Sequence, residues 1–170
     1  ITGNVSHAYL FCGPRGTGKT STARIFTKAV NCLDATEGNP CNNCTLCISV
    51  NEGTAIDLLE LDTASNRGID EITSIRDKAN YAALEAKYKV YVLDEAHMLI
   101  REASNALLKT LEEPPAHVIF ILATTEPHRL TNTIISRCQR FDFRRISTNA
   151  MTERLIKIAD SENVNVDGSV

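Results

Sequence analysis

The stretch that decides the fold is "AYLFCGPRGTGKTSTARIFTKAV", residues 8–30. Residues 8–13 are strand-like and stop at a glycine loop, and residues 20–30 carry apolar side chains at helical spacing. The loop between them, "GPRGTGKT" at residues 13–20, matches the phosphate-binding pattern G-x-x-x-x-G-K-[ST]. Because phosphate binding requires such a loop between a strand and a helix, the stretch predicts a nucleotide site in an α/β fold.

Each part of this loop has an expected role. The glycines let the backbone turn tightly, so that successive N–H groups face one anion. Lys19 supplies a point charge to the β- and γ-phosphates, and the Thr20 hydroxyl ligates Mg²⁺. The residues expected to contact the nucleotide are Gly13, Gly16, Thr17, Gly18, Lys19, Thr20 and Ser21.

A second motif, "VYVLDEAH" at residues 90–97, ends an apolar strand with adjacent carboxylates. Asp94 suits the metal, together with Thr20, and Glu95 suits the orientation or activation of an attacking water. Thr124 ends the apolar run "FILATT" and is expected to lie beside Asp94, where its hydroxyl senses the γ-phosphate or holds the water. His97 is interpreted as a helix-start residue without a catalytic role.

Four cysteines in residues 31–50, "NCLDATEGNPCNNCTLCISV", have the spacing C-x8-C-x2-C-x2-C. Four thiolates make a closed tetrahedral zinc site, whose job is structural because no position is left for water. Disulfides and an iron–sulfur cluster are the alternatives. The expected zinc ligands are Cys32, Cys41, Cys44 and Cys47, whereas Cys12 and Cys138 are expected to be buried or indifferent thiols.

Apolar runs alternate with helix-period segments along the rest of the chain. This alternation predicts a five-stranded parallel sheet flanked by helices, with ligands at the carboxyl ends of the strands. The expected strands are 8–13, 55–62, 89–96, 117–125 and 139–144; the expected helices are 20–30, 70–86, one from 99 to Pro114, a short one over 129–137, and one from 146 onward. We therefore expect a nucleotide-binding domain over 1–145, with the insertion at 31–50, and the start of a helical lid domain over 146–170.

The composition narrows the function classes. The chain has 170 residues, of which 43% are apolar and 23% charged, with a net charge of −3. No apolar run approaches the length of a membrane span and no basic-then-apolar signal segment opens the chain, so we expect a cytoplasmic protein. Residues 136–145, "SRCQRFDFRR", form a basic edge that fits either a contact with phosphate or an acidic partner, or a solvated arginine face.

The motifs together resemble one family, the ATPase module of bacterial DNA polymerase III gamma/tau subunits, the AAA+ motor of the sliding-clamp loader. The resemblance rests on "HAYLFCGPRGTGKTSTARIFTKAVNC", the cysteine insertion, "VYVLDEAHML", "NALLKTLEEPP", "FILATTEP" and "ISRCQRF". It implies the phosphate, magnesium and zinc roles given above and matches Thr124 to the first sensor position. It also implies that Arg137, in "SRC", is an arginine finger acting in trans on the neighbouring subunit's nucleotide.

The resemblance further implies ATP, Mg²⁺ and Zn²⁺ as cofactors and a motor that opens the clamp and loads it onto primed DNA. Its partners are the other clamp-loader subunits, the clamp and DNA, with Arg67 in "SNRG" as a candidate phosphate contact or an ordinary capped helix start. Parts of the family pattern lie outside the sequence, so we expect weak nucleotide binding and a monomer.

Three alternatives remain open at this point. A non-hydrolysing structural subunit would keep the fold without the chemistry, and another P-loop enzyme such as a kinase would not explain "ISRC". A zinc-finger module that reads DNA would be expected to carry basic residues, yet residues 31–50 contain no Lys or Arg.

Overall fold

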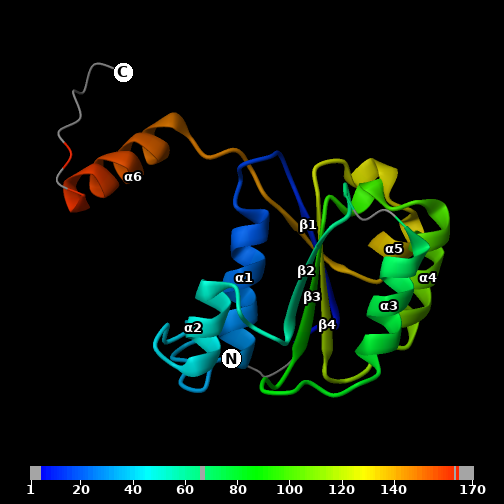
Figure 1. Cartoon of the computed structure of the whole chain (residues 1–170). Helices are drawn as coiled ribbons and strands as arrows, with labels where there is room; N and C mark the ends of the chain where they lie inside the picture. The colour runs from blue at the N-terminus through cyan, green and yellow to red at the C-terminus, as the bar shows by residue number, and fades with distance from the viewer. Residues whose placement is uncertain (1–4, 66–67, 163, 165–170) are drawn as a thin grey trace.

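The computed structural model describes residues 5–65, 68–162 and 164. Figure 1 shows a central sheet with helices on both faces and one helix set apart near the C-terminus. The strands are β1 (Ala8–Cys12), β2 (Leu58–Asp62), β3 (Lys89–Asp94), β4 (Val118–Thr124) and β5 (Gln139–Asp142). The helices are α1 (Lys19–Asn31), α2 (Thr45–Glu52), α3 (Ile69–Ala79), α4 (Arg101–Glu112), α5 (Asn132–Ile135) and α6 (Thr148–Ser161), with short 3₁₀ turns η1 (Ala96–Met98) and η2 (Pro127–Arg129).

The sheet is parallel throughout and has the order β2-β3-β4-β1-β5. Its middle strand, β4, is completely buried, as a parallel strand covered on both faces must be. The chain enters β1 in the interior of the sheet, and β3 and β1 flank β4 on either side. The carboxyl ends of β1, β3 and β4 therefore meet at one edge, where the predicted ligand residues lie. The predicted five-stranded parallel sheet is confirmed.

Alternation along the strands builds two cores. Leu10, Leu93 and Leu122 point to the face covered by α3, α4 and α5. Phe11 and Ile121 point to the opposite face, which α1 covers. Two faces of apolar side chains on one sheet are what a doubly covered parallel sheet requires, and they fix the strand ends rigidly.

Helix α3 is shorter than the sequence predicted, because it ends at Ala79 and not near residue 86. The chain after it turns toward β3, and the Asp57 carboxylate accepts hydrogen bonds from the backbone N–H groups of Leu84, Glu85 and Ala86 at 2.8 to 3.1 Å. A buried side-chain acceptor thus satisfies backbone donors that the predicted helix would have paired internally. The prediction of a helix over 70–86 was wrong beyond residue 79.

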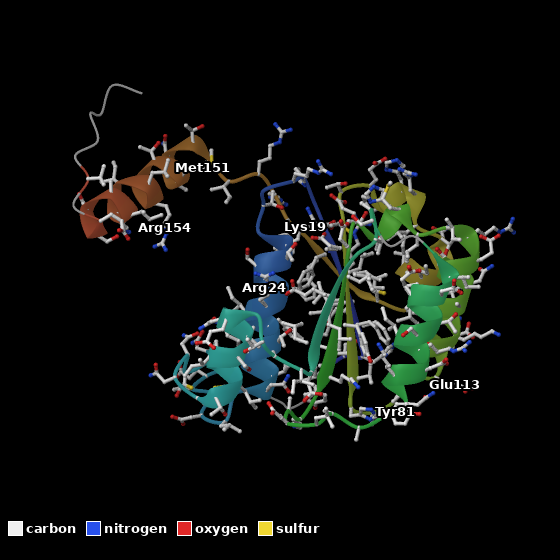
Figure 2. The ribbon with its side chains drawn as sticks, in the orientation of Figure 1. Lys19, Arg24, Tyr81, Glu113, Met151 and Arg154 are labelled. Carbon is white, nitrogen blue, oxygen red and sulfur yellow. The ribbon has the colours of Figure 1, made fainter. Side chains whose placement is uncertain are left out.

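The C-terminal helix α6 stands apart from the sheet. Ser147 caps its N-terminus by accepting a hydrogen bond from the Ala150 N–H at 3.3 Å. None of its described residues is buried, and Figure 2 shows Met151 and Arg154 on this helix, away from the core. Among the residues that the structure describes, no helix is long and apolar enough to cross a membrane.

Candidate active site and metal centre

The phosphate loop, residues 13–18, joins β1 to α1. Gly13 donates its N–H to the Thr124 carbonyl over 3.1 Å, and any side chain on it would run into the backbone of Phe143. This close approach requires glycine. Gly18 has φ 88°, a left-handed conformation that turns the chain into α1. Within the described residues no side chain caps this helix, so its first N–H groups are left to bind an anion.

Lys19 is the first residue of α1 and is only 7% exposed. Its Nζ donates to the carbonyl oxygens of Gly13 and Pro14 at 2.8 and 2.9 Å. Figure 2 shows Lys19 at the end of α1 that meets the loop. Because its hydrogen-bond partners in the described chain are neutral carbonyls, its positive charge is available to an anionic phosphate.

The two side chains predicted to bind Mg²⁺ meet in the folded chain. The Thr20 hydroxyl donates to Asp94 Oδ2 over 2.8 Å, although the two residues are 74 positions apart. The second oxygen of Asp94 accepts the N–H of Glu95 at 2.9 Å, which fixes the carboxylate plane. Hydroxyl and carboxylate oxygens are the hard ligands that Mg²⁺ prefers, so this pair fits the ion.

These groups surround an open cavity of about 390 Å³ at the carboxyl edge of the sheet. Its lining combines the loop, the start of α1 and the end of β3: Arg15, Gly16, Gly18, Lys19, Thr20, Ser21, Asp94 and Glu95. The cavity is large enough for several phosphate groups and presents cationic, hydroxyl and carboxylate groups together. Of the predicted nucleotide contacts, Gly13 and Thr17 are not part of this lining, and the Thr17 hydroxyl donates to the Pro14 carbonyl at 2.8 Å.

Glu95 has an unusual backbone, with φ 49°. A left-handed conformation costs a non-glycine residue on the order of 1–2 kcal/mol, so its surroundings must hold it. Thr63, buried at the end of β2, does so by donating its hydroxyl to the Glu95 carbonyl at 2.6 Å and its N–H to the Asp94 carbonyl at 3.0 Å. Sequence reasoning missed Thr63, because its role depends on β2 lying beside β3.

The Glu95 carboxylate reaches into the cavity and is held from two sides. Oε2 accepts the Thr125 hydroxyl at 3.0 Å, and Oε1 lies 3.4 Å from Arg15 Nε. Burial works to raise the pKa of this carboxyl, but the hydrogen bonds from Thr125 and Arg15, with the nearby His97 ring, outweigh it and hold the pKa below its usual value. The group is therefore ionised, as orientation or deprotonation of water requires.

Thr124 and Thr125 end β4 together, and the structure gives them different partners. Thr124 is completely buried; its hydroxyl oxygen accepts the N–H of Glu126 at 3.0 Å and lies 3.0 Å from His97 Nδ1. Strand β4 pairs with β3, which confirms that Thr124 lies on the strand next to Asp94. Thr125, however, is the hydroxyl that contacts Glu95, and the doublet in "ATTEP" is the sequence signal that could have suggested it.

The four predicted zinc ligands come together at the other end of α1. The Sγ atoms of Cys32, Cys41, Cys44 and Cys47 all lie within 4.8 Å of one another, and all four thiols are free. Cys32 ends α1, Cys44 begins α2, and Cys47 is buried inside α2. Four thiol sulfurs at these separations fit one tetrahedral zinc, and the arrangement disfavours the disulfide alternative. The helix α2 is the part of this insertion that its turn-rich sequence did not predict.

Backbone N–H groups point at the sulfurs of this cluster. Cys32 Sγ accepts the Cys41 N–H at 3.2 Å, and Cys41 Sγ accepts the Cys44 N–H at 3.3 Å. The Leu33 N–H lowers the pKa of Cys44 to about 6, against the opposing effect of burial. Burial raises the pKa of Cys47 to about 12, and the Cys44 sulfur adds to the rise. A divalent cation is the ligand that would let all four sulfurs ionise together.

The remaining predicted residues lie elsewhere. Arg137 follows α5; its guanidinium contacts Glu112 Oε1 at 2.7 Å and the Thr133 carbonyl at 2.8 Å, so it is held outside the cavity described above. Arg67 lies outside the described residues. Cys12 is buried in the core and Cys138 packs against it, which confirms that both are core thiols.

Comparisons with known proteins agree with this geometry. The sequence profile of the family described as "DNA polymerase III, delta subunit" matches residues 1–147. The chain is 60% identical over 162 residues to the DNA polymerase III subunit tau of Bacillus subtilis, which covers 95% of this chain and 29% of that protein. The chain thus spans less than a third of this relative's length.

Solved structures show the same fold. A DNA polymerase III gamma subunit-related protein from Thermotoga maritima has a TM-score of 0.60 and 25% identity, over 90% of this chain and 45% of that one. The Holliday junction branch migration motor RuvB of T. maritima has a TM-score of 0.64 and 17% identity, over 97% and 47%. These neighbours share a P-loop AAA+ fold. The chain therefore has a P-loop AAA+ fold and belongs to the DNA polymerase III subunit family, with tau and gamma/tau subunits as relatives.

Proposed function

We propose that this chain is the nucleotide-binding module of a longer subunit, the ATP-hydrolysing motor of a bacterial sliding-clamp loader. One observation carries the proposal: the Thr20 hydroxyl meets the Asp94 carboxylate at 2.8 Å in the cavity that Lys19 and Glu95 also line. The similarity to the DNA polymerase III subunit tau of B. subtilis supports a role in such an assembly.

Each residue of the cavity is proposed to have a separate role in ATP hydrolysis. Lys19 and the N–H groups at the start of α1 would bind the phosphates, and Thr20 with Asp94 would hold Mg²⁺, which would supply neutralisation of phosphate charge. Glu95 orients the attacking water and accepts its proton as the oxygen bonds to the γ-phosphorus and the bond to ADP breaks. Thr124 is proposed to act as the sensor through the contacts at the end of β4.

Hydrolysis is proposed to be a property of the assembly. Arg137 does not line the cavity of its own chain but is held on the α4–α5 side by Glu112 and Thr133. This placement suits an arginine finger that completes a neighbouring subunit's site, a contribution on the order of 10³–10⁵ in rate. The isolated 170-residue chain is accordingly expected to hydrolyse ATP slowly.

Zinc is proposed to be a structural ion held by Cys32, Cys41, Cys44 and Cys47. The insertion buries little apolar surface of its own, so a closed metal site would supply its stability. Lys28 of α1 links this helix to the insertion, since its Nζ donates to the side-chain carbonyls of Asn42 in the insertion and Asn51 in α2, both at 2.8 Å. These contacts support a scaffold or protein-contact role.

The division of the chain and its partners follow the same proposal. Residues 1–145 would be the nucleotide-binding domain, and residues 146–170 would begin a lid domain. The exposure of α6 on all faces supports this division, because a helix at the start of a further domain would pack against that domain. The partners would be the other clamp-loader subunits, the sliding clamp and primed DNA, in the cytoplasm. ATP would favour clamp opening and capture of DNA, and hydrolysis would release the clamp.

The test is ATP hydrolysis by the full-length subunit assembled with its partners, with and without clamp and primed DNA. Lys19→Ala and Arg137→Ala should each abolish the DNA-stimulated rate, while Arg129→Ala, an exposed arginine on the neighbouring turn, should not. Assemblies that mix Lys19→Ala with Arg137→Ala subunits should regain part of the rate if Arg137 acts in trans. ATP binding without any hydrolysis would instead favour a structural, non-hydrolysing subunit.

A further inference from the structure

His97, two residues after the proposed catalytic carboxylate of Glu95, has an almost completely buried side chain. His97 lies in η1, as the helix-start interpretation expected, but its side chain is only 6% exposed. Nδ1 lies 3.0 Å from Thr124 Oγ1 and 3.4 Å from Glu95 Oε2, and Nε2 lies 3.3 Å from Glu126 Oε1. One ring therefore touches the side chains of Glu95, Thr124 and Glu126, which come from two different strand ends.

The partners of the ring leave it little freedom. Thr124 already accepts the N–H of Glu126, so its hydroxyl position is fixed by the backbone after β4. A carboxylate faces each ring nitrogen, Glu95 on the Nδ1 side and Glu126 on the Nε2 side. A ring with protons on both nitrogens can donate to both carboxylates, whereas a neutral ring can donate to one.

His117 shows by contrast what a purely structural histidine looks like in this chain. Its Nε2 lies 3.1 Å from the Ala79 carbonyl and 3.0 Å from the Tyr81 carbonyl, where it caps the end of α3. Its partners are backbone atoms remote from the cavity. Within the described part of the chain, the hydrogen bonds and ion pairs of His97 are all with side chains, and one of these is the Glu95 carboxylate, which we propose orients the attacking water.

We propose that His97 is a positioning residue for ATP hydrolysis, which fixes the Glu95 carboxylate against Thr124 and links it to Glu126. The inference rests on the proposed function. Glu126 opens the segment that runs through η2 and α5 to Arg137, so the ring joins the carboxylate of one site to the segment that carries the finger for the next. A shift of that segment at a subunit contact would reach Glu95 through the ring.

Three substitutions separate the two sides of the ring. His97→Ala removes both contacts, His97→Asn places an amide near the Nδ1 position, and His97→Gln reaches toward the Nε2 position. The readout is the steady-state kcat and KM for ATP of the full-length subunit in its assembly, with clamp and primed DNA. His128→Ala is the matched control, since His128 also lies near Glu126, at 3.7 Å, but is exposed.

We expect His97→Ala to lower kcat roughly 10- to 100-fold, the penalty of a misplaced catalytic group, with KM changed by less than about twofold. Lys19 and Thr20, which bind the nucleotide, do not touch the ring. His97→Asn should recover part of kcat because it restores the Glu95 and Thr124 side, and His97→Gln should recover less. His128→Ala should keep the wild-type kcat.

The hydrolysis rates of Glu95→Gln and Lys19→Ala distinguish a failure of this inference from a failure of the proposed function. If both retain wild-type hydrolysis, the proposed function fails. If both are inactive while His97→Ala and His97→Asn keep the wild-type kcat, only the positioning role fails. A raised KM with unchanged kcat would likewise overturn it. If His97→Ala loses its cooperative thermal unfolding, His97→Asn and Glu126→Gln decide, and a wild-type kcat in both overturns the link.

Discussion

The two ends of α1 carry sites of different construction. At its N-terminus the cavity draws together two residues 74 positions apart, Thr20 from the first turn of α1 and Asp94 from the end of β3, which the buried sheet holds in place. At its C-terminus the cysteine cluster comes from residues 32–47 alone, and most of that segment is exposed. The cavity is thus preorganised by the core, whereas we propose that the order of the cluster depends on a bound metal. The comparison predicts that perturbing each end has different consequences.

The largest effect is expected from removing a zinc ligand. Cys47→Ser should abolish zinc binding, and amide hydrogens of α2 should then exchange as in an unfolded segment while those of β1, β3 and β4 stay protected. The physical reason is that zinc binding supplies folding free energy, on the order of 10 kcal/mol in small zinc modules. Metal analysis measures the zinc content of each variant, and hydrogen exchange measures the protection of α2. Cys138→Ser, a thiol outside the cluster, should keep one zinc per chain; equal protection of α2 in both variants would contradict the prediction.

The next effect concerns the other end of α1. Gly13→Ala should lower the free energy of unfolding by about 2–3 kcal/mol, because its Cβ meets the backbone of Phe143 in a packed sheet. Gly16→Ala has a comparably unusual φ of 75° but open space around it, so about 1 kcal/mol is expected. Urea unfolding of both variants gives the difference. Equal losses would mean that the loop is not held tightly by the core.

A third prediction concerns the loop against which the insertion rests. Asp57→Asn should lower the free energy of unfolding by about 1–3 kcal/mol at neutral pH, because the carboxylate accepts the N–H groups of Leu84, Glu85 and Ala86. Burial works to raise the pKa of Asp57, but these hydrogen bonds and Lys89 hold it below its usual value.

The sign of the pH dependence follows from that lowered pKa. The stabilisation is fully present above the unfolded-state pKa of about 3.9 and is lost as pH falls through the lower folded-state value. The difference between wild type and Asp57→Asn, measured by urea unfolding at pH 7 and near pH 3, should therefore shrink at the acidic end. A difference that stays constant would show that the charge of Asp57 is irrelevant.

The smallest effect is expected between the two sites. Arg24, in the middle of α1, forms a two-pronged ion pair with Glu60 of β2, both contacts at 2.6 Å, and its side chain is half exposed (Figure 2). An exposed pair of this kind couples by about 1 kcal/mol or less, and less at high salt. A double-mutant cycle with Arg24→Ala and Glu60→Ala measures it. A coupling well above this value would make the pair a structural link between sheet and α1.

Features built from residues close in sequence could be predicted, whereas those that depend on residues distant in sequence could not. The phosphate loop and the cysteine cluster were predictable because their residues are close in sequence and their spacing reflects one ligand. The strands were predictable because buried parallel strands are apolar runs. The loop after α3 was not, because the buried carboxylate of Asp57, the residue before β2, replaces helical hydrogen bonds there.

The side-chain contacts around the cavity could not be predicted without knowing the strand order. Thr63, Thr125 and His97 gain their partners only because β2, β3 and β4 lie side by side. The buried side of α1 was also unforeseen, since it includes Thr27 and Asn31 while the apolar Ile25 is exposed. Asn31 is buried because its amide pairs with both the N–H and the carbonyl of Tyr88, a contact no periodicity reveals.

The nucleotide site is tested most directly by calorimetric titration of ATP, with and without Mg²⁺, into the full-length subunit and two variants. We expect Mg²⁺-dependent binding by the wild type and loss of the Mg²⁺ dependence in Thr20→Val. In Lys19→Ala, which removes a charge-assisted hydrogen bond to phosphate, binding should weaken at least about tenfold. Binding of ATP that is indifferent to Mg²⁺ and to both substitutions would contradict the assignment of this cavity as the nucleotide site.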